Sequence, residues 1–115
     1  MRTMKQADVI GAEDAKLLQE IKRVIQEFLP TATVLLYGSV ARGAQDSESD
    51  YDILVLTDEA LTFSQEDQID DAIYDLQLEA GTVISTMFYA RSQWELPLFR
   101  GMPFRHEVEK DAVLL

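Results

Sequence analysis

Residues 35–56 read LLYGSVARGAQDSESDYDILVL, and this stretch decides the expected fold. Thr33–Tyr37 (TVLLY) and Tyr51–Thr57 (YDILVLT) are short, apolar and rich in β-branched or aromatic residues, which predicts two buried strands. Residues 39–50 between them are small, polar and turn-like, and one helical turn is expected near their start. A glycine–serine pair thus ends the first strand, and an Asp-x-Asp pair begins the second.

Helices and a third strand are expected on either side of this stretch. Apolar residues recur with helical spacing over Glu13–Phe28, and a Leu-Pro pair ends that helix. Ser64 with Asp67 three residues later predicts the start of the next helix, and Gly81 its end. The remaining expected elements are a strand at Thr82–Ala90, a short helix capped by Ser92 and Glu95 that runs into Leu96-Pro97, a last helix at Phe104–Asp111 and an apolar tail at Ala112–Leu115.

This order of elements predicts an α/β or α+β fold, with a small sheet covered by helices on at least one face. The chain has 115 residues, which fits a single domain over residues 1–115. With 47% hydrophobic and 27% charged residues, the composition is that of an ordinary soluble globule.

Charge and cysteine content exclude several classes of function. Ten Lys and Arg residues against twenty-one Asp and Glu give a formal net charge of −11, so we expect no binding to nucleic acid or to an anionic membrane. A divalent cation or a basic protein surface is the natural partner of such a chain. The absence of cysteine excludes thiol and zinc-ribbon chemistry and agrees with a cytoplasmic location. No signal peptide and no apolar run of about 20 residues is found, which predicts no membrane span.

Asp50 and Asp52 form the first half of a candidate site. Residues at i and i+2 on a strand point to the same face, so their carboxylates are expected to lie close together. Two such carboxylates repel each other unless a positive group lies between them. Mg²⁺, which binds one or two carboxylates together with substrate phosphates, is the expected metal.

Gly38, Ser39 and Arg42 form the second half. The missing Cβ of Gly38 would let a phosphate approach the backbone, and Ser39 adds a hydroxyl and amide groups at the start of a helical turn. Arg42 lies one turn further and could offset phosphate charge. A Gly-Ser pair or an Asp-x-Asp pair alone is often structural. Their combination beside a strongly apolar strand favours a functional site, because a buried carboxylate without a ligand is costly.

The segments LYGSVARG (36–43) and SDYDILV (49–55) together resemble the signature of the DNA polymerase-β nucleotidyltransferase superfamily. The glycine, the serine, the ten intervening residues and the Asp-x-Asp pair match its spacing without a gap. The Ala-Arg-Gly after the serine is similar to the minimal nucleotidyltransferases, single-domain prokaryotic proteins commonly encoded beside a helical HEPN-domain toxin.

The resemblance implies a mixed sheet flanked by helices, a metal–ATP site, and transfer of a nucleoside monophosphate to an acceptor hydroxyl. Gly38 and Ser39 would hold the triphosphate, while Asp50 and Asp52 would hold Mg²⁺ and act in catalysis. The superfamily usually has a third carboxylate in a later strand. In TVISTMFYA the best-aligned position is Ser85, so the group that would activate the acceptor hydroxyl is missing.

The leading hypothesis is a Mg²⁺-dependent nucleotidyltransferase that moves AMP from ATP to a hydroxyl of a partner protein, with the chain acting as antitoxin to a HEPN-type toxin. A catalytically weak or inactive antitoxin that only masks its partner is the first alternative. A nucleotidyltransferase that modifies a small molecule, of the aminoglycoside-modifying kind, is the second. The sequence does not decide whether the chain forms homo-oligomers.

Other polar and aromatic residues have simpler interpretations. His106 has no second ligand at metal spacing and is expected on the surface. Tyr37 and Tyr51 flank the motif and could either stack on a base or belong to the core. Trp94, Phe99 and Phe104 are expected to cover the edge of the sheet. The acids of the helix that follows Ser64 are expected to form a solvated face or a landing site for a basic protein: Glu66, Asp67, Asp70, Asp71 and Asp75.

Overall fold

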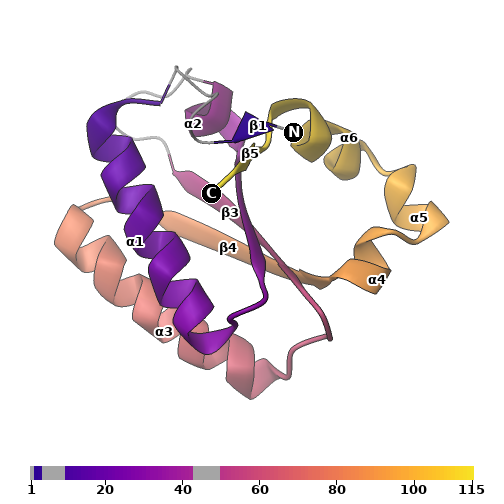
Figure 1. Cartoon of the computed structure of the whole chain (residues 1–115), viewed down its shortest axis with the longest axis horizontal. Helices are drawn as coiled ribbons and strands as arrows, with labels where there is room; N and C mark the ends of the chain where they lie inside the picture. The colour runs from indigo at the N-terminus through magenta and orange to yellow at the C-terminus, as the bar shows by residue number, and fades with distance from the viewer. Residues whose placement is uncertain (1, 4–9, 43–49) are drawn as a thin grey trace.

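The computed structural model describes residues 2–3, 10–42 and 50–115. In chain order its elements are β1 (Arg2–Thr3), α1 (Ala12–Phe28), β2 (Thr33–Tyr37), α2 (Gly38–Arg42), β3 (Tyr51–Thr57), α3 (Phe63–Ala80), β4 (Ile84–Ala90), α4 (Arg91–Trp94), α5 (Pro97–Arg100), α6 (Pro103–Asp111) and β5 (Val113–Leu114). Figure 1 shows α1 and α3 side by side on one side of the strands, with α4, α5 and α6 on the other.

The strands of these ranges form one mixed sheet in the order β1-β5-β2-β3-β4. β3 is antiparallel to β2 and parallel to β4, and β5 is antiparallel to β2 and parallel to β1. A parallel pair needs a crossover connection, and α3 supplies it between β3 and β4. The predicted α/β fold, a small mixed sheet flanked by helices, is therefore confirmed (Figure 1).

The face of the sheet under α1 and α3 is a closed apolar core. Successive side chains of a strand alternate between faces, so every second residue of β2 and β3 lies here. Each of the strand residues Leu36, Ile53 and Val55 is fully buried. The helices contribute most of the predicted apolar stripe of the first helix, although Phe28 at its end is exposed, and part of the stripe predicted for the second. The buried residues of the two helices are Leu18, Ile21, Val24, Ile25, Ile69 and Ile73.

The opposite face carries a second, smaller core under α4 and α6. Leu35 and Leu54 from the strands pack with Trp94, Val108 and Ala112. Tyr37, Tyr89, Phe99 and Phe104 border this cluster, and several of their rings meet edge to face. The three aromatic residues expected at the edge of the sheet therefore cover this face instead.

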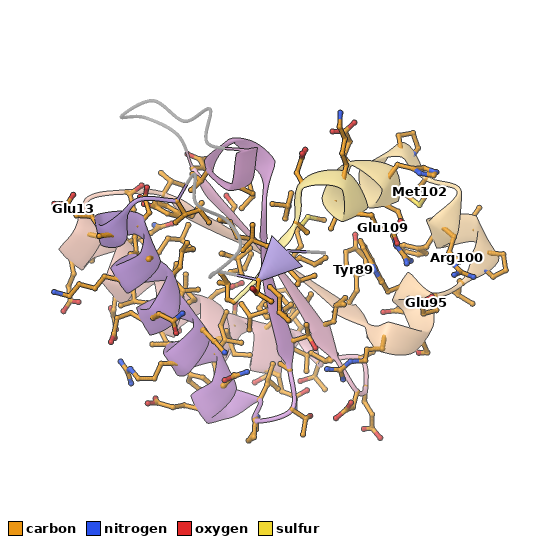
Figure 2. The ribbon with its side chains drawn as sticks, turned by 45° about the horizontal axis from the view of Figure 1, so that its top comes forward. Glu13, Tyr89, Glu95, Arg100, Met102 and Glu109 are labelled. Atoms are coloured by element: carbon orange, nitrogen blue, oxygen red, sulfur yellow. The ribbon has the colours of Figure 1, made fainter. Side chains whose placement is uncertain are left out.

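Arg105 ties the short helices to one another. It is buried, and its guanidinium lies 4.6 Å from the Trp94 ring centroid and donates to the Trp94 carbonyl oxygen. It also pairs with Glu109 at 2.7 Å and with Glu95 at 3.3 Å, while Arg100 meets Glu95 from α5. Figure 2 shows Glu95, Arg100 and Glu109 gathered between these helices. Planar guanidinium groups suit such a shared, largely desolvated position.

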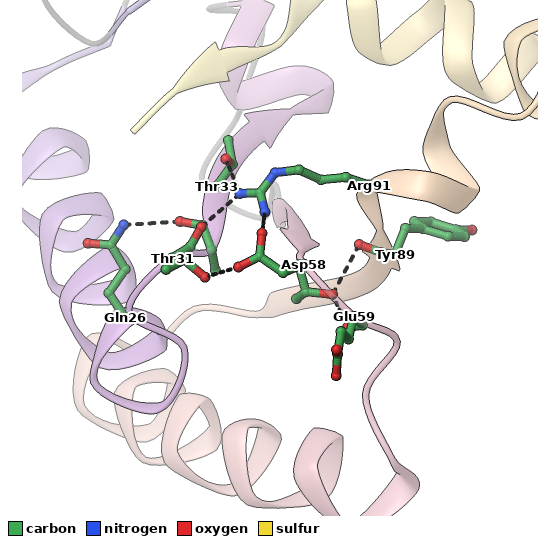
Figure 3. Close-up of polar contacts among 9 residues, drawn as sticks. Gln26, Thr31, Thr33, Asp58, Glu59, Tyr89 and Arg91 are labelled. Atoms are coloured by element: carbon green, nitrogen blue, oxygen red, sulfur yellow. Dashed lines mark hydrogen bonds and ion pairs between the residues drawn. The ribbon is translucent and has the colours of Figure 1, made fainter.

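A second arginine, the first residue of α4, contacts the loop before β2 at the end of the sheet away from Gly38. Arg91 pairs with Asp58 and donates to the carbonyl oxygen of Thr31 and to the Thr33 hydroxyl, at 2.7 and 2.9 Å. The Thr31 hydroxyl donates to the same carboxylate (Figure 3). The charge of Asp58 is thus compensated within the chain.

Three local predictions differ from the structure. The N-cap of α3 is Thr62, which forms a capping box with Gln65, and not Ser64 with Asp67. Both pairs have the required spacing, but Gln65 has the Glu/Gln length that the capping box uses at N3, whereas the Asp67 side chain is one methylene shorter. Gly81 ends the helix as predicted, with φ of 67°.

The second capping prediction, Ser92 with Glu95, is also wrong, because α4 begins at Arg91 and the Gln93 side chain accepts from the Ala90 N–H instead. The third strand begins at Ile84, two residues later than predicted, and a further short helix, α5, begins at Pro97. The apolar tail contains β5, which pairs with β2. The predicted last helix is present as α6. None of the helices in the described ranges combines the length and apolarity of a membrane span.

Candidate nucleotide site

The candidate residues meet where β2 ends and β3 begins. The two strands are antiparallel, and Tyr37 pairs with Asp52 in their register. Gly38 follows directly as the first residue of α2. Asp50 is exposed and stands immediately before β3, whereas Asp52 is the second residue of the strand and is half-buried. The fold thus brings Gly38 and Asp52 together across the strand pair.

The Asp52 carboxylate packs so closely against the backbone of Gly38 that a side chain at position 38 would not fit. Gly38 has a φ of 80°, a left-handed conformation that other residues rarely adopt. A Cβ at this position would overlap Asp52 Oδ2 and would lie 3.2 Å from its Cγ. The missing Cβ therefore makes room for the Asp52 carboxylate against the backbone. From the sequence, this room is expected for a phosphate; the structure places the Asp52 carboxylate there.

Asp52 has two further neighbours across the sheet. Tyr37 flanks it on β2 and Ser85 flanks it on β4, in register on either side. Burial, with the nearby Asp52 carboxylate as the second cause, raises the pKa of the Tyr37 phenol. That phenol stays protonated at neutral pH, and it donates to Met87 Sδ at 3.2 Å. Ser85 lies directly beside Asp52, the position at which the family's third carboxylate was expected.

Tyr51 lies on the other face and takes no part in this arrangement. Its side chain is buried under α1, and its hydroxyl donates to Asp14. Burial, followed by this hydrogen bond, raises the pKa of Tyr51 well above its usual value. Of the two tyrosines beside the motif, Tyr51 is thus a core residue. Tyr37 is half-buried on the Asp52 face, with its ring 5.6 Å from that of Phe104.

The backbone places Ser39 and Arg42 within α2. Their side chains, and the whole of residues 43–49 between α2 and Asp50, lie outside what the structure describes. The predicted contacts of Ser39 and Arg42 with a nucleotide therefore stay predictions. Val40 and Ala41 of the same helix are buried in the core under α1, which anchors α2 at this end of the sheet.

The two carboxylates fit a magnesium–nucleotide complex in their chemistry. Mg²⁺ prefers oxygen ligands and is commonly held by one or two carboxylates, with water and substrate phosphates completing its shell. Among the described residues, no group of three or more His, Asp or Glu side chains is gathered closely enough to hold a metal by itself. If Asp50 and Asp52 hold Mg²⁺, water and substrate phosphates would supply its remaining oxygen ligands.

Other predicted features lie elsewhere. His106 is exposed on α6, as predicted. A hollow of about 410 Å³ lies at the opposite end of β2 and β3, where Pro30, Asp58 and Leu61 are among its lining residues. It is lined by two acids, Asp58 and Glu59, and Arg91 already compensates the charge of Asp58.

A sequence profile of the nucleotidyltransferase domain family matches residues 18–109. The chain belongs to this family. The match runs from α1 to α6 and includes Gly38, Asp50 and Asp52. A protein of Methanocaldococcus jannaschii named "Putative protein adenylyltransferase" is 32% identical over 82 residues, which cover 70% of this chain and 83% of that protein. Nucleotidyl transfer is therefore the class of reaction that this nucleotidyltransferase domain supports.

Proposed function

We propose that this nucleotidyltransferase binds ATP with Mg²⁺ at Gly38, Asp50 and Asp52, and transfers AMP to a hydroxyl of a partner protein. The packing of the Asp52 carboxylate against Gly38 carries the proposal. It fixes an acid at the point where the family's motif would bind a triphosphate. Ser39 and Arg42, on the adjoining helix α2, would add a hydroxyl and a positive charge for the phosphates.

The reaction is a displacement at the α-phosphorus of ATP. The acceptor oxygen forms a bond to that phosphorus, the bond to the pyrophosphate oxygen breaks, and the hydroxyl proton leaves to a base or to water. Mg²⁺, when bound, offsets the charge that the phosphates carry. Asp50 and Asp52, at the start of β3, would hold that ion, and Tyr37 stands beside Asp52 as a neutral phenol.

We propose that the acceptor is a helical HEPN-type toxin and that this chain is its antitoxin. The segment Gly38–Gly43 supports this through its resemblance to minimal nucleotidyltransferases. The net charge of −11 also suits a basic protein partner better than a nucleic acid. The name of the archaeal relative describes that protein, too, as one that adenylylates proteins.

The second candidate is an antitoxin that neutralises its partner by binding alone. Ser85 favours it, because a serine stands beside Asp52 where a third carboxylate would activate the acceptor. If this chain does catalyse transfer, either the partner supplies the base or the reaction is slow. Modification of a small molecule, the third candidate, has no comparable observation in its favour.

Incubation with ATP labelled at its α-phosphate separates these candidates. The purified chain is mixed with Mg²⁺ and the product of the neighbouring gene, and we expect label on that protein. Asp52→Asn should remove the label, while Asp71→Asn, an exposed acid on α3, should keep it. A partner that stays unlabelled, yet is still inhibited by the Asp50→Asn/Asp52→Asn double variant, would show masking and contradict the transfer reaction.

A further inference from the structure

The outer edge of β4 is open to another chain along the middle of the strand. β4 is the last strand of the sheet and pairs only with β3 among the described strands (Figure 1). The N–H and C=O of one residue point to the same side of a strand, and the sides alternate along it. The Val83 carbonyl oxygen accepts from the Tyr51 N–H at 2.9 Å and so faces β3. The backbone groups of Ile84, Thr86, Phe88 and Ala90 therefore face outward.

Side chains of this protein cap both ends of that edge. The Ile84 N–H donates to Gln77 Oε1 at 2.8 Å, and the Ala90 N–H donates to Gln93 Oε1 at 3.1 Å. Both bonds confirm the outward direction of these groups. Between the caps, the outward backbone groups of Thr86 and Phe88 have no hydrogen-bond partner within the part of the chain that the structure describes. An unpaired edge of this kind is a template for an additional strand.

A hollow follows the open part of the edge. It has a volume of about 260 Å³ and lies between β4 and the first half of α3. The α3 side contributes Phe63, which is 80% exposed, and three acids. The β4 side contributes Thr86 to Tyr89, and the Thr86 hydroxyl donates to Asp70 at 2.7 Å. A strand placed on this edge would send every second side chain into the hollow.

Charge decides which kind of strand fits. The three acids of the hollow are Glu66, Asp67 and Asp70. Asp71 and Asp75 extend the negative surface along α3. A second copy of this chain would bring two such helices together, with −11 on each chain, so self-pairing is disfavoured. Lysine or arginine side chains at alternate positions would instead lie against the acids.

We propose that the edge of β4 between Gln77 and Gln93 is a docking site for an extended, basic segment of a partner protein, which adds a strand to the sheet. The intervening side chains of that segment would lie on the opposite face, where Met87 and Tyr89 are half-buried. Backbone pairing supplies affinity in this mode of recognition, and the alternate side chains supply specificity.

The site has a direct bearing on the proposed function, although docking itself does not rest on that function. Ser85 is the β4 residue beside Asp52, and the open part of the edge begins at the next residue. Neighbouring strands lie roughly 5 Å apart, so a docked segment runs about 10 Å from the strand that carries Asp52. An acceptor held there has its hydroxyl-bearing residues close to the transfer site.

Fluorescence anisotropy with a labelled peptide of four Lys-Val repeats, measured without ATP or metal at low salt, tests the docking site. We expect binding to the wild-type chain and roughly three- to tenfold weaker binding to Glu66→Gln/Asp67→Asn, since two surface charge pairs are lost. Asp71→Asn/Asp75→Asn is the matched control, with the same charge change on the same helix but outside the hollow. It should weaken binding clearly less than Glu66→Gln/Asp67→Asn does, because its charges act on the peptide only at a distance.

A peptide of the same sequence with methylated backbone nitrogens tests the strand pairing. It keeps every charge but cannot donate to β4, so its binding should be lost. Equal binding of both peptides, or equal weakening by the two double variants, would mean non-specific attraction and would overturn the proposal. Sedimentation that shows a dimer dissociated by the peptide would assign the edge to a second copy and overturn it as well. These binding measurements do not depend on transferase activity, so they can succeed or fail independently of the proposed function.

Discussion

The two faces of the sheet differ in how far their apolar packing extends. Under α1 and α3, the odd residues of β3 are buried along the whole strand, and even Tyr51 at its start is enclosed. On the opposite face, apolar cover from α4 and α6 reaches Leu54 but stops before Asp52. One strand thus stabilises the fold with one set of side chains and forms the candidate site with the other.

The difference between the faces predicts which substitutions should lower the stability of the fold and which should affect the candidate site. Adjacent residues on β3 belong to opposite faces. A change at Ile53 acts on a closed core, whereas a change at Asp52 acts on an incompletely covered carboxylate beside Gly38.

Ile53→Ala should give the largest loss of stability. Ile53 is fully buried, and removal of such a side chain costs about 2–5 kcal/mol through lost burial and a residual cavity. Asp52→Asn, one residue away, should change the free energy of unfolding by less than about 1 kcal/mol, because it keeps the volume of the side chain. Urea denaturation of both variants measures this. Equal losses would contradict the division between the faces.

Gly38→Ala should have the next largest effect, and Gly81→Ala provides its control. Both glycines have positive φ, so alanine costs each roughly 1–2 kcal/mol in backbone strain. At Gly81 a Cβ meets nothing within 4 Å, but at Gly38 it overlaps Asp52. Gly38→Ala should therefore lose more stability and also ATP binding, which calorimetry measures on the folded variant. Equal loss in both variants, with ATP binding intact, would mean that Gly38 is only a turn residue.

Tyr51→Phe should cost about 1 kcal/mol near neutral pH, since it removes the hydrogen bond to Asp14. The pKa of Tyr51 is higher in the folded chain than in the unfolded chain. The unfolded state therefore releases the proton first as the pH rises above about 10, and the wild type loses stability there. Tyr51→Phe should lose less over the same range. Denaturation at a series of alkaline pH values shows this as converging curves, and parallel curves would contradict it.

Ser85→Asp should have the smallest effect on stability and should raise the rate of transfer. Ser85 is half-exposed and lies beside Asp52 in register. A carboxylate there could accept the proton of the acceptor hydroxyl, a contribution that typically reaches about 100-fold or more when the geometry is good. Ser85→Asn, which adds nearly the same side-chain volume without a base, is the matched control and should leave the rate unchanged. If Ser85→Asp is no faster than the control, Ser85 does not stand where a third carboxylate would activate the acceptor hydroxyl.

Most of the fold was predictable because its signals are local. The strands β2 and β3 are apolar runs with clear ends, and the helix α1 has a continuous stripe and a Leu-Pro stop. The caps of α3 and α4 were misassigned because the sequence offers competing starts two residues apart: Ser64 with Asp67 competes with Thr62 and Gln65, and Ser92 with Glu95 competes with Ala90 and Gln93. The pairing of β5 with β2 joins residues nearly eighty positions apart, which no local pattern specifies.

The site was predictable as a motif but not as a geometry. The spacing of Gly38, Asp50 and Asp52 is visible in the sequence, and so is the alignment of Ser85 with the missing acid. The overlap between Asp52 and a Cβ at Gly38 depends on the φ of the glycine and on the register of two strands. The same register places Tyr37 beside Asp52, a relation that antiparallel pairing of the flanking strands could have indicated.

The most direct test of the central claim is calorimetric titration of ATP, with and without Mg²⁺, into the wild type and the Asp50→Asn/Asp52→Asn double variant. We expect Mg²⁺ to strengthen the binding of ATP to the wild type, and we expect this strengthening to be lost in the double variant. Asp71→Asn/Asp75→Asn, with the same change of charge on α3, should bind as the wild type does. Equal Mg²⁺-dependent affinity in all three proteins would contradict the assignment of Asp50 and Asp52 to the nucleotide site.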